Sequence, residues 1–395
     1  MRQARRLILG PMIFLRWRLP QLIRREAGFF KWIFQTSGSL LPSRSNERRL
    51  LLVHDLSQQP FSIGDILVVQ EASLVLREKF QLGKVDFAIV YNPQSPTVPD
   101  PALVSITEEN AMYHLAGILP AAQANQHLGS LFIFDSHSNL ARFIADNGDL
   151  YHVWPSAWKY AVPEYLYYVV VNDLLYNFHK EHGWIPHMTC RPFLADWAED
   201  FYQKHVYPSV PVTVNIRNNK AFATHRNVAL ESWMEFFRDC EKRYPVKFII
   251  ICGRAEVDDR LRQFSNVIIA KDYHTGIEQD LALIQAAVMH LGAPSGPAQI
   301  AIFGAKPFLI VQADLNLELH HCLIQEGRFL RYTFASPMQR FALGECTTDL
   351  LVAKFARMWD AIDGSNLHYG VQAESKSQAQ QLSWMRKIAR QREEV

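Results

Sequence analysis

Residues 212–217 read VTVNIR and residues 294–297 read PSGP. The first stretch is typical of a buried strand that ends in polar residues, and the second follows an apolar run and precedes an expected helix. Arg226, Trp233 and a glycine turn lie between them. Because ligands of open α/β sheets bind at the carboxyl ends of parallel strands, this order predicts a cradle for the diphosphate of a nucleotide.

The rest of the chain repeats the alternation of strands and helices. Its 395 residues, 49% hydrophobic and 20% charged, are enough for two domain cores. We expect strands at 49–54, 85–90, 129–134, 212–216, 247–252, 267–270, 290–291 and 308–311, and helices at 66–80, 228–244, 256–264, 278–287 and 298–303. The pattern predicts an α/β protein with two Rossmann-like domains that face each other across a cleft.

We place the domain boundaries where the composition changes. Residues 1–48 form a basic amphipathic segment, 49–206 and 207–364 form the two Rossmann-like domains, and 365–395 form a polar tail. Residues 151–205 are rich in aromatic side chains and are expected to be mostly helical, as one wall of an acceptor groove or as ordinary core. The proline-containing stretch 207–211 is the expected linker.

Charge is unevenly distributed. Residues 1–49 carry 11 Lys and Arg against two Glu, a net charge of +9, and the remainder carries −7. A basic head on an acidic body argues against nucleic-acid binding by the folded domains. Within residues 1–40 the cations alternate with Trp, Phe and Leu, which predicts peripheral contact with a membrane or, alternatively, a helix that packs on the protein itself. No span or secretory signal is evident, so we expect a cytoplasmic protein.

The five cysteines are scattered and never form a Cys-x-x-Cys pair. They predict neither a disulfide framework nor a zinc site.

Two groups of residues are candidates for binding a diphosphate. Arg217, Lys220 and Arg226 follow the strand at 212–216, where guanidinium groups can bind phosphate oxygens in pairs, although a solvated basic loop would look similar. In the second group, Gly296 allows close backbone approach and the Ser295 hydroxyl can donate to phosphate. A plain helix cap at Ser295 is the alternative.

The second half resembles the donor domain of GT-B glycosyltransferases, most closely the heptosyltransferase group and related bacterial surface-polysaccharide enzymes. Arg226 and Trp233 keep the family's Lys-to-Trp spacing, with Arg in place of Lys. Gly253 and Glu256 are similar to its Gly and its nucleoside-binding Glu. The phosphate motif is matched by residues 294–296, with Pro294 in place of Asp, and then by residues 304–307.

This resemblance implies an inverting reaction with a nucleotide-diphosphate sugar as donor substrate and no cofactor. It also implies that Asp65, in a Gly-Asp pair at the start of a helix, deprotonates the acceptor hydroxyl. The alternative is that Asp65 is a helix N-cap or a first-turn carboxylate stabilised by the helix dipole. His54, Asp55, Asp135 and His137 are reserve candidates at two strand ends.

The sequence therefore predicts a metal-independent glycosyltransferase, since no Asp-x-Asp triplet is present to hold a divalent ion on the diphosphate. The expected partners are a nucleotide sugar and a glycan or lipid-linked acceptor. Two alternatives stay open: a non-catalytic membrane-associated scaffold with the same fold, and a fucosyltransferase-like enzyme that uses a GDP-sugar and binds it through Arg217.

Overall fold

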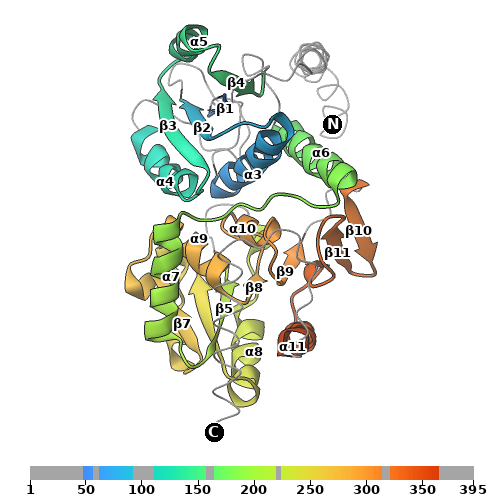
Figure 1. Ribbon diagram of the computed structural model, residues 1–395. Coiled ribbons are helices and arrows are strands. Elements are labelled where there is room, and N and C mark those ends of the chain that lie inside the picture. The colour runs from blue at the N-terminus through green and yellow to red at the C-terminus, as the bar shows by residue number, and fades with distance from the viewer. Residues whose placement is uncertain are drawn as a thin grey trace, which may run out of the picture. The chain divides into compact units, whose positions relative to one another are not determined.

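The computed structural model describes residues 48–56, 62–91, 111–156, 164–218, 224–313 and 321–363 (Figure 1). The chain divides into two compact units. The first unit comprises the described parts of 1–61, 76–115 and 127–170, and the second comprises those of 62–75, 116–126 and 171–395. The expected basic segment 1–48 lies outside the described residues except for Arg48, as do the polar tail 365–395 and Lys220.

The first unit is built on a parallel sheet in the order β3-β2-β1-β4. Its strands are β1 (Arg49–Asp55), β2 (Val85–Val90), β3 (Leu128–Phe134) and β4 (Tyr151–Trp154). Nearly every residue of β1 and β2 is buried, as expected for parallel strands covered on both faces. Helix α5 (His137–Asp146) adds Leu140 and Phe143 to an apolar cluster with Phe132 and Tyr151.

Three helices cross the division between the units. They are α3 (Ile63–Phe80), α4 (Ala111–Gln123) and α6 (Glu164–His182), and α7 (Pro192–His205) follows in the second unit. Helix α3 begins three residues before the expected helix 66–80 because Ser62 caps its first turn: the Ser62 hydroxyl accepts from Asp65 N at 3.3 Å.

The second unit contains a larger sheet in the order β10-β11-β12-β9-β8-β5-β6-β7. From β12 to β7 all neighbours are parallel, whereas β10, β11 and β12 pair antiparallel. The strands are β5 (Val210–Asn215), β6 (Val246–Ile251), β7 (Val267–Ile269), β8 (Met289–Gly292), β9 (Phe308–Ala313), β10 (Leu323–Glu326), β11 (Phe329–Tyr332) and β12 (Gln339–Leu343).

Helices α8 (Leu230–Arg243) and α11 (Thr348–Asp363) pack together and bury their aromatic residues against this sheet. Trp233, Phe236 and Phe355 are completely buried in one cluster with alternate residues of β5 and β6 such as Val214 and Phe248. Helix α9 (Ile277–Ala286) packs against α7. It also packs against the one-turn helix α10 (Gln299–Ile302), which follows strand β8.

The α/β class and the mainly parallel sheets predicted from the sequence are confirmed. Two local predictions are wrong. Residues 256–264 form two 3-10 turns, η3 (Arg254–Glu256) and η4 (Asp259–Gln263), rather than an α-helix. The expected linker 207–211 ends early because Val210 and Pro211 already belong to β5. Residues 151–205 were expected to be mostly helical, which α6 and α7 confirm, although the stretch opens with strand β4.

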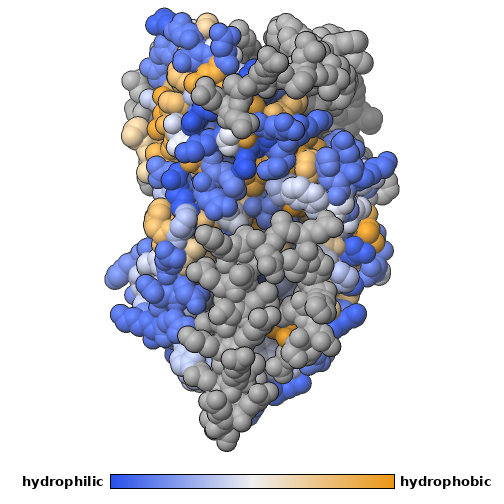
Figure 2. All heavy atoms as spheres, in the orientation of Figure 1, coloured by the Kyte–Doolittle hydropathy of each residue, from blue (hydrophilic) through white to orange (hydrophobic). Residues whose placement is uncertain are grey.

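Surface composition agrees with burial of most large apolar side chains. Figure 2 shows one face, on which the described residues are mainly hydrophilic and the hydrophobic ones occupy smaller areas. Phe193, 64% exposed, is one of the exceptions. Among the helices that the structure describes, none combines the length and the apolar composition needed to cross a membrane.

Candidate functional site

Three neighbouring strands of the second unit end side by side. Asn215 at the end of β5 pairs in register with Ile251 of β6 on one side and with Gly292 of β8 on the other. Arg217 follows β5 by two residues, Gly253 follows β6 by two, and Ser295 follows β8 by three. The candidate residues therefore leave the same edge of the sheet, at the carboxyl ends where such folds bind ligands.

Asn215 and Gly292 fix the geometry of this edge. The buried Asn215 amide donates from Nδ2 to the carbonyl oxygen of Ile251 at 2.7 Å, which ties β5 to β6. Gly292 has φ of +152°, and a Cβ there would lie 2.5 Å from the Asn215 carbonyl oxygen. Only glycine fits this position, because other residues rarely adopt the backbone conformation found there and because their side chains would collide with Asn215.

Arg217 and Arg226 form a cationic pair beside Glu256. Val228 N donates to the Arg217 carbonyl oxygen at 3.3 Å, which folds the segment with η2 (Thr224–Arg226) back toward β5. Burial lowers the pKa of Arg217, the Glu256 carboxylate raises it, and the Arg226 charge lowers it. Two cations in this arrangement repel each other, so a bound anion between them would be stabilised.

Gly253 and Glu256 belong to one short turn. Gly253 precedes η3, and its carbonyl oxygen accepts from Glu256 N at 2.9 Å. A Cβ at Gly253 would meet the Glu256 side chain at 3.7 Å, an ordinary contact. Position 253 therefore does not require glycine for space, in contrast to Gly292.

Ser295 and Gly296 lie in the turn between β8 and α10. The Ser295 hydroxyl oxygen is buried and has no hydrogen-bond partner among the described residues. A Cβ at Gly296 would lie 2.8 Å from Gly64 N and 3.0 Å from Ile63 Cβ. The turn of the candidate phosphate site therefore lies directly against the first turn of α3. Gly64 and Gly296 belong to the same compact unit.

Asp65 lies in that first turn of α3. It is 2% exposed, and its Oδ2 accepts a hydrogen bond from the Ser62 hydroxyl at 2.6 Å. Ser62 is the capping residue and Asp65 the third residue of the helix, so the sequence alternative of Asp65 as the N-cap is wrong, whereas that of a first-turn carboxylate describes its position.

The reserve candidates lie in the first unit. His137 Nε2 and Asp55 Oδ2 are 2.6 Å apart, and hydrogen bonding to Asp55 raises the pKa of His137. Asp135 instead accepts from Asn139 Nδ2 at 2.6 Å within the start of α5. An imidazole oriented by a buried carboxylate can act as a general base. The sequence did not indicate that these two residues pair.

Sequence reasoning did not single out Glu71, a buried acid of the second unit. Glu71 of α3 is completely buried, and its Oε2 accepts from Met188 N at 3.1 Å. Burial raises the pKa of Glu71 well above its usual range. The signal in the sequence is an acidic residue in a mainly apolar stretch, at residues 66–76.

Comparison with known proteins gave matches among solved structures alone. No protein-family model matches the chain, and no curated protein matches it either. The chain is similar to the glycosyl transferase family 9 structure from Veillonella parvula DSM 2008, with 12% identity over 87% of this chain and 99% of that one, at a TM-score of 0.47.

Two further structures represent other sugar transferases. The E. coli heptosyltransferase WaaC with ADP-2-deoxy-2-fluoro heptose has 13% identity over 78% of this chain and 99% of that one, at a TM-score of 0.40. The fucosyltransferase NodZ from Bradyrhizobium has 10% identity over 65% and 94%, at 0.30. All three TM-scores are below 0.5.

Proposed function

We propose that this chain is an inverting glycosyltransferase of the GT-B type, which transfers a sugar from a nucleotide-diphosphate donor to an acceptor hydroxyl. The observation that supports this most is the contact between Gly64 and Gly296. It joins the turn of the candidate base, Asp65, to the turn of the candidate phosphate ligand, Ser295, within one compact unit.

In the proposed reaction Asp65 removes the proton from the acceptor hydroxyl, whose oxygen attacks the anomeric carbon of the donor. The bond from that carbon to the diphosphate breaks, and the configuration inverts. Arg217 and Arg226 stabilise the charge that grows on the leaving diphosphate, and the Ser295 hydroxyl donates a hydrogen bond to it. Lys220, which follows Arg217 in the sequence, is proposed as a further cation for the diphosphate. Gly253 and Glu256 are proposed to contact the nucleoside.

These cations make a metal ion on the diphosphate unnecessary in our proposal. Guanidinium groups offer paired hydrogen bonds to phosphate oxygens and stay protonated at neutral pH. The pKa of Arg217 is lowered by burial and by the neighbouring Arg226 charge. A bound diphosphate would offset the effect of the Arg226 charge.

Replacement of Asp65 tests the catalytic step. We expect Asp65→Asn to bind the donor nucleotide like the wild type and to release nucleoside diphosphate at least about a hundredfold more slowly, because the base is lost. Asp349→Asn is the matched control, since Asp349 also lies in the first turn of a helix, α11, and should leave turnover unchanged. Full activity of Asp65→Asn together with loss of activity in His137→Gln would assign the base to the Asp55–His137 pair.

We further propose that residues 1–40 hold the enzyme peripherally at the cytoplasmic face of a membrane, near a lipid-linked or polysaccharide acceptor. Support comes from the alternation of cations with Trp and Phe in this segment. The full chain should sediment with vesicles that contain anionic lipid, and a chain that lacks residues 1–40 should not. Equal sedimentation of the two would contradict the assignment.

One observation favours a second candidate function. Asp65 is almost completely buried and bonded to Ser62, as a purely structural carboxylate in a helix would be. A non-catalytic scaffold of the same fold would then bind a nucleotide without turning over any donor.

A further inference from the structure

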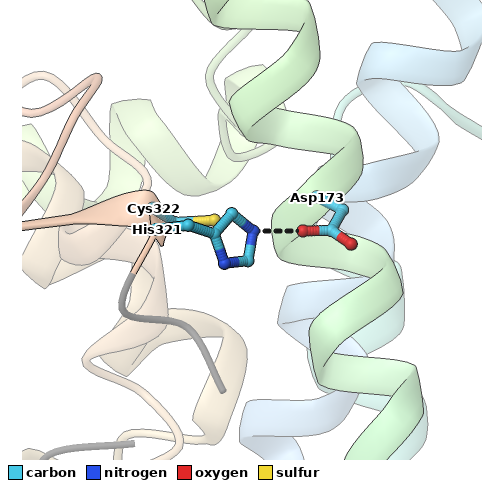
Figure 3. Close-up of side chains that lie close together, drawn as sticks. All are labelled: Asp173, His321 and Cys322. Carbon is cyan, nitrogen blue, oxygen red and sulfur yellow. Dashed lines mark hydrogen bonds and ion pairs between the residues drawn. The ribbon is translucent and has the colours of Figure 1, made fainter. Parts of the chain in front are cut away.

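Three side chains with metal-binding atoms converge at one place in the second unit. Asp173 comes from α6, and His321 and Cys322 directly precede β10 (Figure 3). His321 Nε2 lies 2.5 Å from Asp173 Oδ1, and one carboxylate oxygen, one imidazole nitrogen and the Cys322 sulfur all lie within 4.8 Å of one another. These residues are separate from those of the proposed donor site.

Neighbouring contacts hold the three residues in place. The Cys322 carbonyl oxygen accepts from Thr333 N at 2.9 Å, which anchors the start of the β10–β11 hairpin. Its thiol lies 3.9 Å from the carbonyl oxygen of Asn172 on α6. The Tyr176 ring, one helical turn from Asn172, meets the His321 ring edge-on at a centroid distance of 5.6 Å.

The three types of donor atom suit a transition metal. Sulfur, imidazole nitrogen and carboxylate oxygen are the three donor types that Zn²⁺ takes in proteins, whereas Mg²⁺ and Ca²⁺ bind oxygen. Atoms bound tetrahedrally to one Zn²⁺ at about 2.0 to 2.3 Å lie about 3.3 to 3.8 Å apart, so the three donor atoms, now within 4.8 Å of one another, would adjust their spacing when an ion binds. The side chains of Asp173 and His321 are 43% and 41% exposed, so small rotations of these side chains can break the hydrogen bond between them and make room for an ion.

We propose that Asp173, His321 and Cys322 form a binding site for Zn²⁺, with a water molecule in the fourth position. The ion would join α6 to the β10–β11 hairpin, two segments far apart in the sequence. Its role would be to hold this antiparallel part of the sheet against the helix, independently of sugar transfer. The scattered cysteines gave no sign of such a site, because its ligands come from a helix and a strand end rather than from one short motif.

Cobalt binding tests the proposal with a direct spectroscopic readout. Full-length protein stripped with a chelator is titrated with Co²⁺, and a thiolate-to-cobalt charge-transfer band should appear and saturate at about one ion per chain. Zn²⁺ added afterwards should abolish the band by displacing the cobalt.

Variants identify the ligands. Cys322→Ser should lose the charge-transfer band, whereas Cys346→Ser, which replaces another buried and free cysteine, should keep it. Asp173→Asn changes a partly exposed side chain and should weaken Zn²⁺ binding at least about tenfold in competition with a chelator. No saturable band in the wild type, an unchanged band in Cys322→Ser, or unchanged zinc affinity in Asp173→Asn would each overturn the proposal and leave an ordinary surface ion pair.

Discussion

At the scale of single residues, replacing Ser295 distinguishes a nucleotide-binding role of its hydroxyl from a structural role. Its buried hydroxyl oxygen has no hydrogen-bond partner among the described residues, so it adds no hydrogen bond that stabilises the folded state. We expect Ser295→Ala to leave the free energy of unfolding unchanged or slightly higher, and to weaken nucleotide-diphosphate binding by about 0.5–1.5 kcal/mol. Denaturant unfolding and calorimetric titration of the same variant measure the two effects. Loss of stability with unchanged affinity would indicate a structural cap.

His290 makes the stability of the second unit depend on pH. It is completely buried in β8, its Nδ1 lies 3.0 Å from the Thr213 hydroxyl oxygen, and burial lowers its pKa to about 3. The unfolded chain binds a proton below about pH 6.5 while the folded state does not, so stability falls as the pH falls from about 6.5 toward 3.

The size of this effect follows from the slope of about 1.4 kcal/mol per pH unit. Between pH 7 and pH 5 the His290 contribution to the free energy of unfolding should fall by about 2 kcal/mol. His290→Asn keeps a polar group near Thr213 but cannot titrate. Urea unfolding at the two pH values should therefore show a smaller acid loss in the variant, and an equal loss in both proteins would contradict the prediction.

At the scale of elements, two glycines give opposite expectations for the same substitution. Gly296→Ala would push its methyl group to within 2.8 Å of Gly64 N, so the turn and the start of α3 must move apart. We expect a loss of about 1–3 kcal/mol in the free energy of unfolding and weaker donor binding. Gly117 lies inside α4, where an added Cβ meets nothing within 4 Å.

Gly117→Ala is therefore the matched control for the glycine prediction. Alanine favours the helix interior by roughly 0.5–1 kcal/mol over glycine, so this variant should be more stable than the wild type. Thermal unfolding of both variants checks the pair. A Gly296→Ala protein as stable as the wild type would mean that the turn after β8 does not depend on its contact with α3.

Two segments of the second unit differ from the sequence prediction for physical reasons. Residues 256–264 have apolar positions at helical spacing, yet the Asp258 side chain accepts from Arg260 N at 3.0 Å and stabilises a 3-10 turn instead. Such bonds between side chain and backbone compete with the α-helix. The β10–β11 hairpin was missed because its turn relies on Gly327, at φ of +64°, in a polar stretch without a strong turn dipeptide.

For the whole molecule, apolar runs such as 248–251 and 87–90 were enough to predict parallel strands and the α/β class, because buried strands have few polar residues. Side-chain partners across long sequence separations could not be predicted. The Asp55–His137 pair, the contact of Gly64 with Gly296 and the Asp173–His321–Cys322 cluster each depend on tertiary geometry that no local pattern encodes.

The most direct test of the proposed nucleotide-diphosphate site is calorimetric titration of the full chain with UDP, GDP, ADP and CMP, with and without magnesium. We predict saturable binding of one nucleoside diphosphate, unaffected by magnesium and weakened at least about tenfold, or about 1.4 kcal/mol, in Arg226→Ala. Arg243→Ala, at the far end of α8, should bind like the wild type. GDP as the nucleotide bound would favour the fucosyltransferase-like alternative. Binding of none of the four, or equal affinity in Arg226→Ala, would contradict the proposed site.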